Sequence, residues 1–336
     1  LMAGQGQAPA RQAAFKGGLP KEAGAVTLSK MCGSGMKAAM FAHDMLLAGT
    51  HDVMVAGGME SMTNAPYLLQ KGRGGYRLGH DRIFDHMMLD GLEDAYEPGR
   101  SMGTFGEDCA AKYGFTRAEQ DAFATASVER AKAATASGAF AAEITPVTVK
   151  SRAGETVVSV DEGPGKVKLD KIASLKPAFK KDGTITAASS SSINDGAAAL
   201  VMMRASTATK LGCKPLARIV GHATHAQEPE WFATAPLGAT QKALAKAGWA
   251  VGDVDLWEIN EAFAVVPMAL MKELNLPHDK VNVNGGACAL GHPIGASGAR
   301  IMVTLIYALQ ARGLKKGLAT LCIGGGEATA VAVELV

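Results

Sequence analysis

The chain has 336 residues, of which 48% are hydrophobic and 20% charged, and its formal net charge is +2. This composition excludes a disordered protein, and the nearly balanced charge gives no reason to expect nucleic acid or an anionic membrane surface as a partner. No apolar run approaches the roughly 18 residues of a membrane span, and five cysteines, an odd number, favour a reducing compartment over a disulfide framework, so we expect a cytoplasmic protein without a membrane partner.

A thiol lies at a predicted turn from strand to helix near the start of the chain. The apolar stretch Ala25–Leu28 predicts a strand, and Met36, Met40 and Leu46 recur at helical spacing after Cys32. The free N–H groups and the positive dipole end of a helix start favour a thiolate over a thiol. The ordinary alternative for a single free cysteine is a small core residue. Cys32 is therefore a candidate nucleophile only if other residues support it.

The predicted helix leads to a second apolar strand. This strand, Val53–Ala56, stops at Gly57 and Gly58. Because a helix joins two short apolar strands, we expect them to pair in parallel, with cover on both faces of the sheet.

Residues 62–193 have a different character, with many turns, charge clusters and methionines. We interpret them as a loop domain inserted between sheet elements, since long insertions on α/β scaffolds usually carry binding function. Within it the pattern predicts a helix over 117–137, with Thr116 as its N-cap and Glu119 completing a capping box. Short strands are predicted at 147–149 and 155–160.

The remainder of the chain alternates again between strand and helix patterns. Its GASG motif, helix, strand and Gly-Gly-Gly run repeat the order of the GSG motif, helix, strand and Gly-Gly pair near the start. This repetition predicts two related α/β halves with a site between them. The predicted strands are 196–203, 215–220, 254–259, 318–323 and 329–335, and the predicted helices are 238–247, the segment ending near 274, and 299–312.

Two histidines, His222 and His225, lie three residues apart, with no third ligand near them in the chain. We interpret them as loop or surface residues. Because the sequence has no CxxC pair and no clustered Cys/His spacing, we predict no metal site.

Four separated motifs carry residues suited to chemistry. They are Cys32 in CGSG, Asn260 in NEAFA, His292 in GHPIGASG and Cys322 in CIGGG. Each alone has an ordinary interpretation, as a turn, a helix N-cap or a core residue. Together and in this order they resemble the thiolase family, and the resemblance covers essentially the whole chain. Further stretches that match the family's pattern are Glu60–Thr63, Asp90–Leu92 and Ile193–Ala197.

The resemblance implies a thiolase fold, in which two related α/β halves form five layers, α/β/α/β/α, with an inserted loop domain. On this basis residues 1–61 and 194–213 form the N-terminal half, residues 62–193 the loop domain, and residues 214–336 the C-terminal half.

The resemblance also implies roles for the motif residues. Cys32 would be the nucleophile that becomes acylated, with His292 as its activating partner, and Cys322 would be the acid/base that takes a proton from the second substrate. His292, with a water held by Asn260, would face the enolate oxygen. The backbone N–H groups of Cys32 and Gly324 would face the tetrahedral oxyanion, and glycine permits this close approach.

Substrate-binding positions follow from the same resemblance. Ser191 takes the place of a serine that contacts the pantetheine of coenzyme A, although serines in such a stretch also form turns. Met102 matches a substrate-lining position, and Phe263 would line the acyl pocket or serve as ordinary core. Phe179 and Ala187 complete the predicted set. The loop Glu228-Pro229-Glu230-Trp231-Phe232 lies where the family has a pocket loop.

The activity implied is that of an acetyl-CoA C-acetyltransferase acting on coenzyme A thioesters, with no cofactor and with a homodimer or homotetramer as the assembly. A broader 3-ketoacyl-CoA thiolase and a catalytically silent acyl-CoA-binding protein are the alternatives. Ser101 stands where acetoacetyl-CoA thiolases often have histidine. A related carrier-protein condensing enzyme is disfavoured, because such enzymes lack the second catalytic cysteine that Cys322 represents. Segment Tyr67–Arg82 is a candidate contact between copies.

The family normally has more residues before the position of Leu1. The difference is roughly 55 residues, including a first strand, and a sheet without that strand would expose an edge. Our hypothesis is that the chain is truncated or incompletely represented, and that its activity depends on the missing part.

Overall fold

The C-terminal half of the chain builds a four-stranded sheet in the order β7-β10-β9-β8. The computed structural model describes residues 1–152 and 154–336. The central strands β9 (Lys316–Ile323) and β10 (Glu327–Leu335) are nearly continuous apolar runs buried on both faces. Strand β7 (Ala217–Ala226) pairs antiparallel with β10, and β8 (Leu256–Ile259) pairs parallel with β9. Both faces of this sheet must therefore be covered by other elements.

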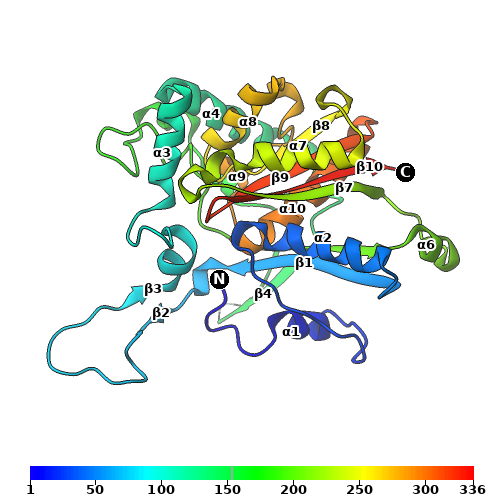
Figure 1. Cartoon of the computed structure of the whole chain (residues 1–336), viewed down its shortest axis with the longest axis horizontal. Coiled ribbons are helices and arrows are strands. Elements are labelled where there is room, and N and C mark those ends of the chain that lie inside the picture. Colours follow the sequence, from blue (N-terminus) through cyan, green and yellow to red (C-terminus); the bar gives the residue numbers. More distant parts are fainter. Residues whose placement is uncertain (153) are drawn as a thin grey trace.

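Two central helices, α2 (Ser34–Leu47) and α10 (Ile294–Arg312), cover one face and separate this sheet from a second one (Figure 1). They cross closely at the two predicted turn motifs. A Cβ on Gly35 would lie 2.8 Å from the backbone nitrogen of Ala299, so this crossing requires glycine. The repeated GSG and ASG motifs thus meet in space.

Helix α10 is longer and more apolar than the sequence analysis anticipated. It has 19 residues, and an 18-residue stretch of it has a mean hydropathy of 1.3, enough in length and composition to cross a membrane. However, 72% of that stretch is buried, against α2 and strands of both sheets. It is the core helix of the molecule.

The second sheet contains two strands, β1 (Val53–Ser61) and β6 (Asp195–Met203), which pair antiparallel. The predicted strand Ala25–Leu28 is wrong: this segment forms no ladder with any described residue, and Val26 is 83% exposed. The predicted parallel pairing of 25–28 with β1 is therefore wrong as well. An apolar run forms a buried strand only when a neighbouring strand supplies its hydrogen bonds.

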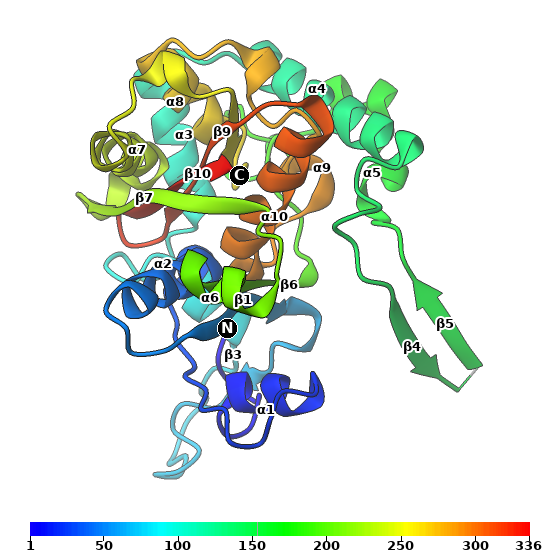
Figure 2. The same cartoon turned by 90° about the vertical axis from the view of Figure 1, so that its right-hand side faces the viewer.

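The outer face of the four-stranded sheet is covered by α7 (Ala235–Ala247), with α8 (Val265–Leu274) beside it (Figure 1). On the opposite side of the molecule, α1 (Pro9–Lys16) lies beyond β1 in both views (Figures 1 and 2). The layers thus run helix, sheet, helix, sheet, helix. The prediction of two α/β halves in five layers is confirmed.

The segment between β1 and β6 contains one long helix, as predicted. Helix α4 (Arg117–Ser137) begins at Thr116, whose hydroxyl accepts from the Glu119 N–H, while the Glu119 carboxylate accepts from the Thr116 N–H. The predicted strands form a hairpin, β4 (Val147–Ser151) with β5 (Gly154–Val158), that extends away from the body of the molecule (Figure 2). The remaining elements are β2 (Tyr67–Leu68), β3 (Phe84–Asp85), α3 (Met102–Tyr113), α5 (Gly163–Lys166), α6 (Ala205–Leu211) and α9 (Ala287–Leu290).

Candidate active site

Cys32 lies in a single 3-10 turn, Met31–Gly33, that leads directly into α2. Met31 has a φ of 46°, a left-handed conformation that is rare for a residue with a side chain and that turns the chain sharply before the thiol. The Ser34 hydroxyl fixes the turn, because it accepts from the Lys30 N–H and donates to the Met31 carbonyl, both at 2.8 Å.

This turn is held against the end of β9. A Cβ on Gly33 would overlap the side chain of Ile323, so glycine is required for the approach. The Lys30 ammonium forms an ion pair with the Glu327 carboxylate at the start of β10. No role for Glu327 was predicted from the sequence, because its partner lies 297 positions earlier in the chain. The two contacts anchor the thiol turn to the β9–β10 turn.

Cys32 is partly buried, and two backbone donors lie at its sulfur. Burial raises the pKa of Cys32 to about 11, against the smaller lowering from hydrogen bonds donated by the backbone N–H groups of Gly324 and of Cys32 itself. The backbone donors thus favour the thiolate, as expected, but desolvation outweighs them. The thiol needs a base. The two N–H groups are those that the sequence analysis expected to face an oxyanion.

His292 is a buried imidazole in its neutral form. Burial lowers its pKa to about 4, with a smaller contribution from the charge of Arg300. Its Nδ1 lies 2.5 Å from the hydroxyl oxygen of Ser297, and that hydroxyl donates its one proton to the Pro293 carbonyl. Nδ1 therefore carries the imidazole proton and donates it to Ser297. Nε2 is left with a free lone pair and has no hydrogen-bond partner among the described residues.

Asn260 lies beside His292. Its backbone N–H donates to the Thr320 carbonyl of β9, and its side-chain nitrogen is 3.4 Å from His292 Nδ1. The residue is 1% exposed, and its Oδ1 has no partner in the part of the chain that the structure describes. Buried polar atoms without partners are rare. Asn260 Oδ1 and His292 Nε2 are thus two buried polar groups available to a ligand.

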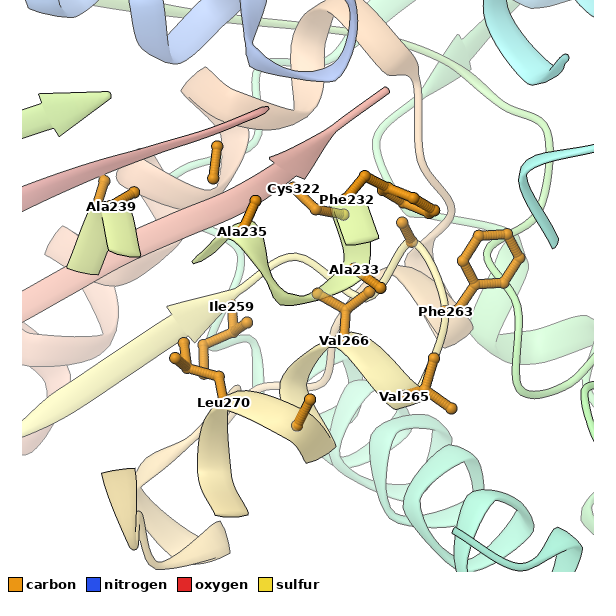
Figure 3. Packing of buried hydrophobic residues seen from close by; sticks show 14 of the residues in the cluster. Phe232, Ala233, Ala235, Ala239, Ile259, Phe263, Val265, Val266, Leu270 and Cys322 are labelled. Carbon is orange, nitrogen blue, oxygen red and sulfur yellow. The ribbon is translucent and has the colours of Figure 1, made fainter. Parts of the chain in front are cut away.

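Cys322 lies on β9, one residue before the end of that strand, among apolar side chains that include Phe232 and Ile259 (Figure 3). Its pKa is raised well above the usual value, first by burial and then by the negative charge of a Cys32 thiolate. Gly33, the residue after Cys32, packs against Ile323, the residue after Cys322, so the two thiols lie near each other although they are separated by 290 positions in the chain.

A buried carboxylate that the sequence analysis missed holds the site loops together. Glu261 accepts from the Ser127 hydroxyl at 2.7 Å, the Asn282 side-chain nitrogen at 2.8 Å and the Cys288 N–H at 2.9 Å. It thereby connects the loop after β8, which carries Asn260, to the segment that leads into His292. Its position directly after Asn260 was the available signal, since a buried glutamate needs several donors.

Three of the predicted substrate residues lie together. The Met102 methyl group is 3.6 Å from the place where a Cβ on Gly324 would be, and a Cβ on Gly103 would overlap the Phe179 ring. The rings of Phe179 and Phe263 stack edge to face, with centroids 5.6 Å apart. This set therefore forms an apolar wall that adjoins Gly324.

The two remaining predicted positions lie in the serine-rich stretch. The Ser191 hydroxyl donates to the Ala262 carbonyl at 3.1 Å, so its oxygen can still accept a hydrogen bond from a ligand. Ala187 is exposed. The backbone of this stretch also contacts the histidine loop, because the His292 N–H donates to the Ser192 carbonyl at 3.1 Å.

The arrangement therefore holds two thiols, a neutral imidazole with a free Nε2 and two backbone donors at one sulfur. Such a set suits formation of a thioester at Cys32 followed by proton transfer in a water-poor site. A surface hollow of about 610 Å³ lies elsewhere, and none of these residues lines it.

Comparisons with known proteins identify the family of the chain. A family model described as thiolase, N-terminal domain, matches residues 1–206, and one described as thiolase, C-terminal domain, matches residues 213–335. An acetyl-CoA acetyltransferase of Chromobacterium violaceum is 53% identical over 336 residues, which cover 99% of this chain and 86% of that protein.

Solved structures give the same result. The acetyl-CoA acetyltransferase of Bacillus anthracis superposes with a TM-score of 0.95 at 44% identity, covering 98% of this chain and 84% of that one. The Acat5 thiolase of Ascaris suum, solved in complex with coenzyme A, has a TM-score of 0.92 at 41% identity, covering 99% and 85%. The chain belongs to the thiolase family.

Proposed function

We propose that the chain is an acetyl-CoA C-acetyltransferase, an acyltransferase that joins two acetyl-CoA molecules into acetoacetyl-CoA and free coenzyme A and also catalyses the reverse cleavage. The observation that carries this proposal is the shared site of the Cys32 and Cys322 sulfurs, with the N–H groups of Cys32 and Gly324 directed at the first sulfur. The relatives named acetyl-CoA acetyltransferase support the choice of substrate.

In the first half-reaction, the Cys32 sulfur attacks the thioester carbonyl of acetyl-CoA. Because its pKa is raised to about 11, the thiol must lose its proton during the attack, and the neutral imidazole of His292 accepts that proton at Nε2. The N–H groups of Cys32 and Gly324 stabilise the oxyanion. The bond between carbonyl carbon and coenzyme A sulfur then breaks, and the leaving sulfur takes the proton of Cys322.

In the second half-reaction, the Cys322 thiolate removes a proton from the methyl group of a second acetyl-CoA. A thiol whose pKa lies well above its usual value is a strong base once ionised. The side chains of Asn260 and His292 stabilise the enolate, whose carbon attacks the acetyl group on Cys32. The Cys32 sulfur leaves and recovers its proton from His292, so both thiols and the imidazole return to their starting states.

The aromatic residues favour a short acyl group. Phe232 lies in the pocket loop and packs edge to face on Phe263, with centroids 6.4 Å apart, and it also contacts Phe105. We expect these rings to limit the room for a longer acyl chain. Thiolysis rates across 3-ketoacyl-CoA chain lengths test this choice, because a preference for long chains would instead support the 3-ketoacyl-CoA thiolase of fatty-acid degradation.

The covalent intermediate distinguishes an enzyme from a silent acyl-CoA-binding protein. After incubation with acetyl-CoA, we expect mass spectrometry to show one added acetyl group, located on Cys32 by peptide mapping. Cys32→Ala should bind acetyl-CoA without being labelled, and Cys213→Ala, an exposed cysteine, is the matched control that should be labelled normally. If the wild-type chain binds acetyl-CoA but is never acetylated, the chain is a catalytically silent acyl-CoA-binding protein and this proposal is wrong.

We also propose a cytoplasmic homodimer or homotetramer that needs no cofactor. The five free cysteines support a reducing compartment. Exposed apolar side chains in the segment Tyr67–Arg82, above all Tyr67 and Leu78, support a contact between copies. Light scattering should show assemblies that Leu78→Glu weakens, whereas Val157→Glu, on the exposed hairpin, leaves them unchanged. A monomeric wild type would contradict the assembly.

A further inference from the structure

Three side chains with metal-ligating atoms meet at the junction between the two halves of the molecule. His43 and Asp44 lie near the end of α2, and His222 lies on β7, opposite Val331 of β10. The sequence analysis placed His222 in a loop or on the surface and found no third ligand. Both interpretations are corrected, because His222 is in a strand with its side chain 11% exposed, and α2 supplies two further ligands.

The ligand atoms have the spacing of a metal site. His222 Nε2 lies 2.9 Å from Asp44 Oδ1 and 3.2 Å from His43 Nδ1, and the last two atoms are 3.6 Å apart. Zinc bonds of about 2.0–2.2 Å at the tetrahedral angle place neighbouring ligand atoms about 3.3–3.6 Å from one another. Small side-chain adjustments would therefore bring all three atoms to bonding distance of one ion.

His222 Nε2 faces both Asp44 and His43 in this cluster. A proton on His222 Nε2 can point at Asp44 or at His43, but not at both. The imidazole rings of the two histidines meet edge to face, with centroids 5.0 Å apart, so a nitrogen of each is directed into the same small space. A cation in that space would interact with all three ligand atoms at once.

We propose that His43, Asp44 and His222 form a binding site for one divalent transition-metal ion, with Zn²⁺ the best match and water in the fourth position. Two imidazole nitrogens and one carboxylate oxygen are a ligand set that zinc accepts, and a three-ligand protein site leaves one position open.

The surrounding charges are compatible with this ion. Lys246 is one cation near enough to act on His222, and the Asp44 carboxylate acts on His222 in the opposite direction. Lys37 is the other nearby cation, and its ammonium is 3.3 Å from the Thr224 hydroxyl and lies over the Phe41 ring. The Asp44 carboxylate offsets part of the positive charge that the ion would add.

The site is remote from the thiols. His43 is nine positions after Ser34, the first residue of α2, which corresponds to about 14 Å along the helix axis. The ion would therefore act as a clamp that joins α2 of one half to β7 of the other, without contacting the reacting groups. We expect the metal-free protein to keep its activity and the metal-bound protein to unfold at a higher temperature.

Cobalt(II) titration of the full chain tests the site, after removal of bound metal with a chelator. We expect one equivalent of Co²⁺ to give the visible absorption of a four-coordinate ion, without the near-ultraviolet band of thiolate-to-cobalt charge transfer, and Zn²⁺ to displace it. His222→Gln and His43→Gln should each weaken binding by more than about 100-fold, since loss of even an outer-shell partner costs about 10–100-fold. His225→Gln, three residues along the same strand, is the matched control and should bind normally.

Asp44→Asn keeps the proposal testable if a histidine variant fails to fold, because Asp44 has a half-exposed side chain that tolerates an amide. It too should weaken binding, while thiolysis activity of all three variants without metal stays at the wild-type level. A charge-transfer band would show that Co²⁺ binds a cysteine instead, and equal binding by wild type and variants, or no stoichiometric binding, would also overturn the proposal.

Discussion

The molecule contains one structural unit twice, in two different surroundings. In both cases a central helix is followed by two antiparallel strands: α2 with β1 and β6, and α10 with β9 and β10. In the second unit β8 and β7 continue the sheet on both sides, whereas no described residue pairs with either outer edge of the first unit. Leu321 of β9 is therefore fully buried, while Val201 of β6 is 68% exposed.

This difference between the two units shows which half of the molecule positions the residues of the site. Asn260, His292, Cys322 and Gly324 all belong to the half whose sheet is covered on both faces. Cys32 belongs to the other half, but its turn is positioned by contacts with β9, with the start of β10 and with α10. The nucleophile is thus supplied by the less buried unit and held in place by the more buried one.

The largest expected effects on activity come from replacing the two thiols, one from each half, and the two replacements should differ in their effect. Cys32→Ala should abolish both acetyl labelling and thiolysis, because no other group can carry the acyl chain. Cys322→Ala should still accept an acetyl group on Cys32, although more slowly because the leaving sulfur loses its proton donor. It should lower the rate of condensation by about 10²–10⁴-fold, the usual contribution of an acid/base group. Mass spectrometry and steady-state kinetics on the same preparations measure the two effects.

Cys213→Ala is the control for loss of a thiol outside the site, because Cys213 is exposed, and its kinetics should match those of the wild type. If Cys322→Ala fails to become labelled, or condenses acetyl-CoA at the normal rate, the division of roles between the two halves is wrong.

A smaller effect compares the two sheets directly. Leu321→Ala removes a fully buried side chain from β9 and should lower the free energy of unfolding by about 2–5 kcal/mol. Val201→Ala, on exposed β6, should change it by no more than about 0.5 kcal/mol. Urea unfolding followed by circular dichroism measures both. Equal losses would show that the first unit is buried in solution as deeply as the second.

Much of this organisation was predictable from the sequence. Helical and strand periodicity located β6 to β10 and the long helices, because these elements have buried faces that impose a clear pattern. The four motifs also pointed to one site. The prediction of a strand at Ala25–Leu28 was wrong, because an apolar run in a sequence does not show whether a partner strand is available in the fold.

The contacts between distant residues were also beyond sequence reasoning. Nothing in the chain relates Lys30 to Glu327, or Ser127 to Glu261, until the fold brings them together. The pKa of Cys32 is a further case: the helix start was visible in the sequence, but the desolvation that outweighs it depends on packing from both halves.

Acid unfolding provides the third test, through a histidine of the more buried half. His292 has a pKa of about 4 in the folded protein and about 6.5 in the unfolded chain. Between these values the unfolded chain binds a proton that the folded protein does not, so stability falls as the pH falls from about 6.5 to 4, by up to about 3 kcal/mol.

His292→Gln should remove this part of the pH dependence, and the difference between its urea-unfolding curve and that of the wild type isolates it from other groups. Glu258, in the same half, has the opposite effect on the pH dependence of stability. Burial raises its pKa to about 8, so it contributes stability that is lost as the pH rises toward 8. Parallel curves for wild type and His292→Gln would mean that His292 is hydrated in the folded state.

The smallest expected effect concerns the contact by which the second unit holds the first. Gly33→Ala would place a methyl group against Ile323, which must move or push the thiol turn away from β9. Overpacking of this kind costs about 1–3 kcal/mol of stability. Gly252→Ala, where an added Cβ meets no atom within 4 Å, is the matched control. Because the turn also positions the Cys32 sulfur beside the Gly324 N–H, Gly33→Ala should slow acetyl labelling by a larger factor than its loss of stability explains. If both variants are labelled at the wild-type rate, the close approach at Gly33 serves packing alone, and the more buried half does not set the position of the nucleophile.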